Sequence, residues 1–373
     1  MKHHLDHDWQ GNMASPRKNL GEKTKLHFFF ILSFVWIFTG LIGHEPWRPL
    51  ESATISQILE IIQSNQFIHP ASASNDVPYY PPLYAFFGAA FAKLLSPFLE
   101  IHDAARISNA MWISLTMLSI GLLTRELWGI GFGRSAGLFF IASIGLIVNI
   151  HTLTPEVAAL FGFGLSLYAF SLYFRRPFRS SVILGIGLSV LFLSNGIIPF
   201  LSILITAFFL GFFSFWKNKR YAIFLGISLL VNLSIVGPWL LLFNISDPSL
   251  FQLWISQPIL NSSPNFWYNL QGIAWFTWPA FPLAVWILCR DYQKIITQKK
   301  FLLPLVFILV YFTLISFSPR EDQINWLPLI IPLCLLAVGS IDLLKRGYAS
   351  ALNWFGILIF GFFSFLIWLG WFA

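Results

Sequence analysis

Long apolar runs separated by short polar clusters dominate the pattern along this chain. Many of the runs hold about twenty residues, the length that an α-helix needs to cross the hydrocarbon core of a bilayer. The pattern therefore predicts an all-α polytopic membrane protein with about 11 transmembrane helices. The expected spans are 27–43, 106–124, 132–150, 156–174, 181–195, 197–215, 221–243, 271–288, 301–317, 324–343 and 352–371. Only the tight turn Ser194-Asn195-Gly196 separates the fifth span from the sixth, so one long broken helix is the alternative there.

Two polar segments between these spans are long enough to hold a functional site, residues 44–105 and residues 244–270. The first begins with LESATISQILEIIQSN, whose apolar residues recur at helical spacing. A second helix is expected after YYPPLY, lying in the membrane interface with Tyr79, Tyr80 and Tyr84 at headgroup depth. The predicted organisation is a basic, His-containing tail over 1–26 and a single transmembrane domain over 27–373.

The composition supports this membrane class, because 57% of the residues are hydrophobic and only 10% are charged, against about 25% charged in a soluble domain. No small-residue cleavage site follows the first apolar run, so this run is expected to remain as a span. The two cysteines, Cys289 and Cys334, fall at different predicted depths, and no disulfide is expected between them.

The charge distribution predicts the orientation. With a cytoplasmic N-terminus, 19 of the 23 Lys and Arg residues fall on the inner side, as the positive-inside rule requires. The net charge of +7 is then an orientation signal, and nucleic acid is not an expected partner. Ten of the 16 acidic residues fall outside, so chemistry is expected at the outer face. The four outer cations are Arg48, Lys93, Arg106 and Arg320.

Three strings in the first outer segment, GHEPWRPLES, YYPPLYAFF and DAARISNA, occur in an order that resembles the C-type membrane glycosyltransferases. The likeness is to the aminoarabinose transferases and the protein O-mannosyltransferases, or glycosyltransferase family 39-like proteins. Later strings such as HTLTPEVAALFGFGLSLYAF and WFTWPAFPLAVW also fit, so the resemblance covers nearly the whole chain from about residue 27.

This resemblance implies a GT-C-like fold with juxtamembrane helices in the first outer loop. It implies transfer of a hexosyl or pentosyl group from a polyprenyl-phosphate carrier to an envelope lipid or glycan. The expected location is the outer face of a bacterial inner membrane. The expected partners are the polyprenyl-phosphate-linked sugar donor and membrane lipids, and a divalent metal is a candidate cofactor.

The sequence departs from the family where the family carries its presumed base. The family loop usually reads like GHDPWKPDEA, and the position of its second aspartate is Leu50 here, followed by Glu51. Glu45 corresponds to the preceding aspartate. The lysine of an SKG-like turn is replaced by Asn195, and a tyrosine ahead of a Leu-Pro pair is replaced by Asn325.

Glycosyl transfer by direct displacement needs a base for the acceptor proton and cationic stabilisation of the leaving phosphate. Glu45 and Glu51 are the candidate catalytic residues, although Glu51 could instead favour the N-terminus of the following helix. Arg48 and Arg320 are the candidate donor-phosphate ligands, because a guanidinium offers a planar fork of donors. Arg106 is expected to anchor the start of its span.

Three further residues are weaker candidates: His44, Glu156 and Tyr84. His44 could share a proton or a metal with Glu45, whereas a lone histidine at a membrane boundary is more often structural. Glu156 follows Pro155 and is expected to serve a helix N-terminus.

Two rival functions stay open at this point. A catalytically degenerate GT-C-like protein would bind a lipid-linked sugar without turnover, as Leu50 and Asn195 favour. A transporter of lipid-linked sugars is the other, against which stand the few ionisable residues inside the spans and the lack of a repeat.

Overall fold

The computed structural model describes residues 21–47, 50–64, 67–68, 80–256, 264–318, 322–341 and seven single positions between 354 and 369. Over these residues the chain is helical, without a strand. It divides into two compact units, Met1–Trp36 and Ile37–Ala373, of which the second holds the helical bundle. The predicted tail over 1–26 is described only from residue 21, and most of the predicted span over 352–371 lies outside the described residues.

The first predicted span is the helix α2, Glu22–Phe38. It ends earlier than the apolar pattern indicated, because glycines follow with the left-handed backbone that L-residues rarely adopt. Gly40 has a φ of 88° and Gly43 a φ of 95°. These residues lead the chain into the loop that carries GHEPW.

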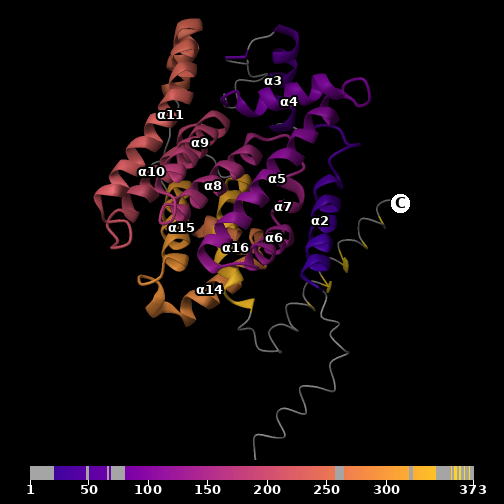
Figure 1. The fold of residues 1–373 in the computed structure, drawn as a ribbon. Coiled ribbons are helices and arrows are strands. Elements are labelled where there is room, and N and C mark those ends of the chain that lie inside the picture. The colour runs from indigo at the N-terminus through magenta and orange to yellow at the C-terminus, as the bar shows by residue number, and fades with distance from the viewer. Residues whose placement is uncertain are drawn as a thin grey trace, which may run out of the picture. The chain divides into compact units, whose positions relative to one another are not determined.

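Five described helices are long and apolar enough to cross a membrane. In the most deeply packed, α8, 83% of the apolar window is buried, whereas in α11 the figure is 17%. Helix α8 packs against both α5 and α9, so it forms the centre of this part of the bundle (Figure 1). The low burial of α11 leaves an apolar surface of the kind that faces lipid. The five helices are α5 (Ile101–Trp128), α8 (Pro155–Leu172), α9 (Pro177–Asn195), α11 (Lys219–Ser246) and α15 (Lys299–Ser316).

The remaining predicted spans are shorter or bent. Helices α13 and α14 meet at an angle of 106° instead of forming the single span predicted over 271–288. The predicted break at Ser194-Asn195-Gly196 is confirmed, because α9 ends at Asn195 and Gly196 has a φ of 80°. The shorter elements are α6 (Phe132–Ala142), α7 (Leu146–Asn149), α10 (Ile197–Leu210), α12 (Pro248–Ser256), α13 (Phe266–Phe276), α14 (Ala280–Arg290), η1 (Tyr292–Lys294), η2 (Gln323–Trp326) and α16 (Leu327–Val338).

One predicted span, 132–150, is interrupted in the structure. Helix α6 ends at Ala142, and the next two backbone N–H groups after Ser143 point at carbonyls of another segment. Ile144 donates to the carbonyl of Trp278 at 3.1 Å, and Gly145 donates to that of Phe276 at 2.7 Å. These bonds replace the helical ones, which is why the apolar run does not continue as one helix.

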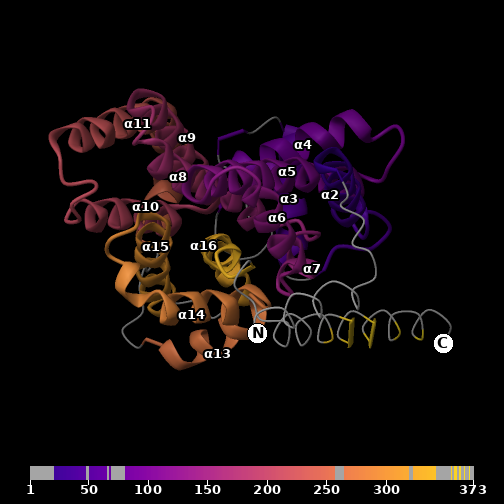
Figure 2. The same cartoon turned by 60° about the horizontal axis from the view of Figure 1, so that its bottom comes forward.

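The predicted helices of the first outer segment are both present, as α3 (Leu50–Ser64) and α4 (Leu83–Leu95). Figures 1 and 2 both show them beside the N-terminal part of α5. They approach closely at Gly88, where an added Cβ would lie 2.7 Å from Cδ1 of Ile58. The side chain of Tyr84, which is predicted to lie at headgroup depth, points from α4 into the protein and is fully buried. Tyr79, for which the same depth is predicted, lies outside the described residues.

Candidate functional site

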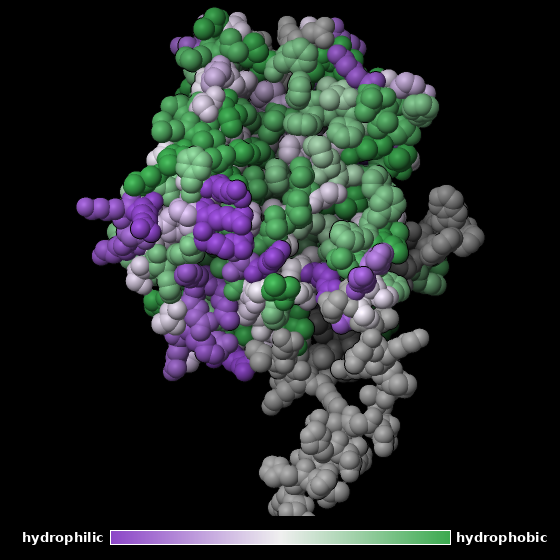
Figure 3. Space-filling view, in the orientation of Figure 1, coloured by the Kyte–Doolittle hydropathy of each residue, from purple (hydrophilic) through white to green (hydrophobic). Residues whose placement is uncertain are grey.

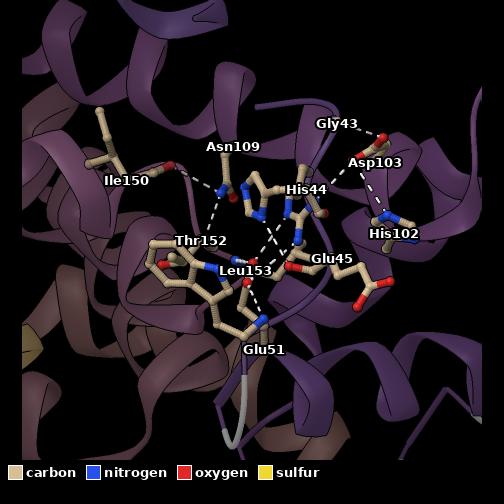
Figure 4. A network of polar contacts seen from close by, with 12 residues as sticks. Gly43, His44, Glu45, Glu51, His102, Asp103, Asn109, Ile150, Thr152 and Leu153 are labelled. Carbon is tan, nitrogen blue, oxygen red and sulfur yellow. Dashed lines mark hydrogen bonds and ion pairs between the residues drawn. The ribbon is translucent and has the colours of Figure 1, made fainter. Parts of the chain in front are cut away.

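The GHEPW loop is held on α5 by the guanidinium of Arg106, which is completely buried. Its Nη1 donates to the backbone carbonyl of His44 at 2.6 Å and to Oδ1 of Asp103 at 2.9 Å. Its Nε donates to Oε1 of Glu51 at 3.2 Å, and its Nη2 to Oε2 at 3.4 Å. One buried cation therefore joins two carboxylates and a loop carbonyl (Figure 4).

Glu51 lies in the first turn of α3, as predicted, and only 1% of it is exposed. Besides Arg106, its carboxylate accepts two backbone N–H groups. Oε2 accepts from Trp47 at 2.8 Å, and Oε1 accepts from Leu153 at 2.7 Å. Glu51 thus ties together α3, the loop before it and the segment that leads into α8.

Asp103 fixes the other end of the loop. It lies in the first turn of α5, and its Oδ2 accepts the backbone N–H of Gly43 at 3.1 Å. The left-handed backbone at Gly43 presents that N–H group, and glycine adopts this conformation with little strain. We define the anchoring network as Arg106, Glu51 and Asp103 with their backbone partners.

Asn109 extends this network one turn further along α5. Its Nδ2 donates to the carbonyls of Ile150 at 3.1 Å and Thr152 at 2.7 Å. Its Oδ1 accepts the hydroxyl of Tyr84 at 2.7 Å. Burial, and next the charge of Glu51, raises the pKa of Tyr84, so its hydroxyl stays protonated and keeps donating. These bonds hold the segment before α8 against α4 and α5.

Glu45 differs from Glu51 because its side chain is exposed. In Figure 4 its carboxylate points away from the anchoring network, and this carboxylate makes no ion pair or hydrogen bond with the residues that the structure describes. The backbone around it is fixed: Arg106 holds the carbonyl of His44, and Glu51 holds the N–H of Trp47. Within the described part of the chain, the loop therefore holds the exposed Glu45 carboxylate on an anchored backbone.

Of the other predicted site residues, His44 and Glu156 lie within the described part of the chain and two arginines do not. His44 is half-buried, its Nδ1 lies 3.0 Å from the carbonyl of Glu45, and its ring centre lies 5.6 Å from that of Trp47. Glu156 lies in the first turn of α8 and accepts the hydroxyl of Tyr80 at 3.1 Å. Arg48 and Arg320, predicted to bind the donor phosphate, lie outside the described residues.

Sequence reasoning placed Arg106 at the start of its span but missed its central position, and it missed Asp103 and Asn109 altogether. Their spacing in DAARISNA was the available signal, because residues three apart lie on one face of a helix. Within the described ranges, no cluster of three or more His, Cys, Asp or Glu side chains is arranged to hold a metal ion. The carboxylates of Glu51 and Asp103 are instead occupied by Arg106.

The chain matches no protein-family model and no curated protein sequence at a significant level. Its fold does match solved structures. ArnT from Cupriavidus metallidurans bound to undecaprenyl phosphate aligns with a TM-score of 0.75 and 16% identity, over 91% of this chain and 64% of ArnT. Apo ArnT aligns with a TM-score of 0.73 and 17% identity, over 88% of this chain and 62% of ArnT.

A more distant match is the oligosaccharyltransferase of Archaeoglobus fulgidus, with a TM-score of 0.60 and 13% identity. The alignment covers 91% of this chain and 53% of the oligosaccharyltransferase, so the chain spans less than two thirds of each of these proteins. Its apolar helices and these alignments agree with the fold expected from the sequence. The chain is a multi-pass membrane protein with the GT-C fold.

Proposed function

We propose that this chain is a glycosyltransferase that moves a sugar from a polyprenyl-phosphate carrier to an envelope lipid or glycan. The proposed location is the outer face of a bacterial inner membrane, with the N-terminus in the cytoplasm. The observation that carries the proposal is the alignment of 91% of the chain with an ArnT structure that holds undecaprenyl phosphate. The exposed Glu45 carboxylate on an anchored loop supplies the chemical group that the reaction needs.

In the proposed reaction, a hydroxyl oxygen of the acceptor attacks the anomeric carbon of the sugar. The bond from that carbon to the phosphate oxygen breaks, and polyprenyl phosphate leaves with the electron pair. Glu45 takes the proton of the attacking hydroxyl as the new bond forms. Because the displacement is direct, it forms no covalent intermediate on the protein and inverts the anomeric configuration.

Glu51 is the other carboxylate predicted as a base, and the geometry favours a positioning role for it. Its two oxygens already accept four hydrogen bonds, two from Arg106 and one each from Trp47 and Leu153. Accepting a proton would weaken every one of these charge-assisted bonds inside a buried site. We therefore assign the base to Glu45 and the fixing of the loop to Glu51.

The leaving phosphate is assigned to Arg48 and Arg320, whose guanidinium groups suit bidentate phosphate binding. Both assignments rest on the sequence alone. The described carboxylates of the anchoring network, Glu51 and Asp103, pair with Arg106 and are therefore poorly suited to hold a divalent metal.

The proposal can be tested with the full chain purified in liposomes and undecaprenyl-phosphate-linked sugars extracted from the native host. The expected result is release of undecaprenyl phosphate that depends on an envelope lipid extract and falls at least 100-fold in Glu45→Gln. Binding of the lipid-linked sugars without any release of undecaprenyl phosphate would overturn the proposed transferase activity and would support the catalytically degenerate binding protein. Movement of intact lipid-linked sugar across the liposome membrane would support the transporter instead.

A further inference from the structure

Three segments far apart in the sequence meet at the end of α8 that lies away from the candidate site. They are the turn between α8 and α9, the segment before α11 and the start of α15. The hydroxyl of Tyr173 donates to Oδ1 of Asn218 at 2.7 Å, and Asn218 caps α11 by accepting the N–H of Tyr221 at 2.9 Å. The Nζ of Lys299 lies 3.3 Å from the ring centre of Phe174 and 5.5 Å from that of Phe215.

This junction gathers positive charge. Two of the meeting segments, 175–179 and 217–220, carry six basic residues and no acidic one. Two acidic residues lie close by, but Glu126 pairs with Arg175 and Asp291 pairs with Lys294. Five exposed cations are left with no carboxylate partner among the described residues, and we call them the basic cluster: Arg176, Arg179, Lys217, Lys219 and Arg220.

Exposed aromatic side chains accompany the basic cluster along the same segments. Phe178 is 69% exposed between two of its arginines, and Phe212, just before the second segment, is 63% exposed. Figure 3 shows hydrophilic residues gathered beside and below a mostly hydrophobic flank of the molecule. Cations with interleaved exposed rings are typical of a surface that inserts at the boundary between lipid headgroups and acyl chains.

The length of α8 places the junction at the opposite membrane surface from Glu51. Helix α8 has 18 residues, which correspond to about 27 Å at 1.5 Å per residue. This is close to the thickness of a hydrocarbon core, about 30 Å. The candidate site lies at the Pro155 end of the helix, because Leu153 binds Glu51 there. The basic cluster then lies at the level of the headgroups of the other leaflet.

We propose that the basic cluster binds the headgroups of anionic phospholipids. The phosphate of such a lipid would meet the arginine and lysine side chains, while its acyl chains would contact the exposed rings of Phe178 and Phe212. A soluble anion would satisfy the charges but would leave these rings in water. This inference does not depend on the proposed transferase activity.

The test uses the full chain in neutral detergent, titrated with phosphatidylglycerol or with phosphatidylcholine of the same acyl chains. Native mass spectrometry measures the bound fraction of each lipid. The wild type is expected to prefer phosphatidylglycerol. The variant Arg176→Gln/Lys217→Gln/Lys219→Gln/Arg220→Gln should bind it about 600-fold more weakly at low salt, since each of the four cations near a lipid surface contributes about fivefold.

A matched control removes the same number of charges from the N-terminal segment, as Lys2→Gln/Arg17→Gln/Lys18→Gln/Lys23→Gln. It should keep the wild-type preference, and helical content by circular dichroism should show that both variants fold. Equal phosphatidylglycerol binding by the wild type and the cluster variant would overturn the proposal. So would displacement of the lipid by inorganic phosphate at micromolar concentration, which would indicate a site for free anions.

Discussion

The carboxylate of Glu51 accepts the backbone N–H of Leu153 at 2.7 Å, across 102 positions of the chain. This bond joins the first turn of α3 to the segment that starts α8, the central helix among the described spans. Arg106 of α5 neutralises the same carboxylate. The loop that carries Glu45 is therefore anchored to the core of the fold. A substitution that removes a hydrogen bond of the anchoring network should change both the loop conformation and the stability of the fold.

The first prediction concerns Glu51→Gln. A neutral amide cannot accept from Leu153 and Trp47 with both of its polar atoms, and it leaves the charge of Arg106 less compensated. We expect a loss of about 3 kcal/mol in the free energy of unfolding, measured by unfolding in mixed micelles. Glu45→Gln is the matched control, since an exposed side chain should change stability by less than about 0.5 kcal/mol. An unchanged stability of Glu51→Gln would contradict the anchoring network.

Arg106→Lys tests whether the network needs a guanidinium as well as a positive charge. An ammonium group is a compact point charge and cannot reach Glu51, Asp103 and the carbonyl of His44 with the same planar fork. We expect the free energy of unfolding to fall by about 2 to 3 kcal/mol, and cleavage of the GHEPW loop by proteases to become faster. Retention of wild-type stability and protease resistance would show that charge alone suffices.

Asn109→Leu removes the hydrogen bonds that join α5 to the segment before α8. The carbonyls of Ile150 and Thr152 and the hydroxyl of Tyr84 would each lose a buried partner. We expect a loss of about 2 to 4 kcal/mol, since each unsatisfied buried group costs about 1 to 3 kcal/mol and relaxation recovers part of it. Ser114→Ala, further along α5, removes only a bond within the helix and is the control. Equal stabilities for the two variants would argue against this role of Asn109.

Much of the fold could be predicted from the sequence because apolar runs of membrane length have few alternatives to a helix. The breaks were harder. The run around WFTWPAF contains a single polar residue, Thr277, so its length does not reveal the bend of 106° between α13 and α14. The end of α6 depends on hydrogen bonds to Trp278 and Phe276, more than 130 residues away, and local propensity contains no signal for them.

The candidate site was predictable only in part. The position of Glu51 in the first turn of a helix follows from local sequence, and it is confirmed. The burial of Glu51 and its bond to Leu153 depend on how α3, α5 and α8 pack, which the pattern of residues does not define. For the same reason the sequence predicts only a span anchor at Arg106, whereas its carboxylate partners give it the central place in the network.

The most direct test of the account measures envelope lipids and glycans by mass spectrometry in a deletion strain of the native host. The strain is complemented with wild type, Glu45→Gln or Glu45→Asp, each at matched membrane abundance. We predict that one defined sugar disappears in the deletion, returns fully with wild type and partly with Glu45→Asp, and stays absent with Glu45→Gln. Full return of the sugar with Glu45→Gln, or an unchanged profile in the deletion, would contradict the assignment of Glu45 as the base of a glycosyltransferase.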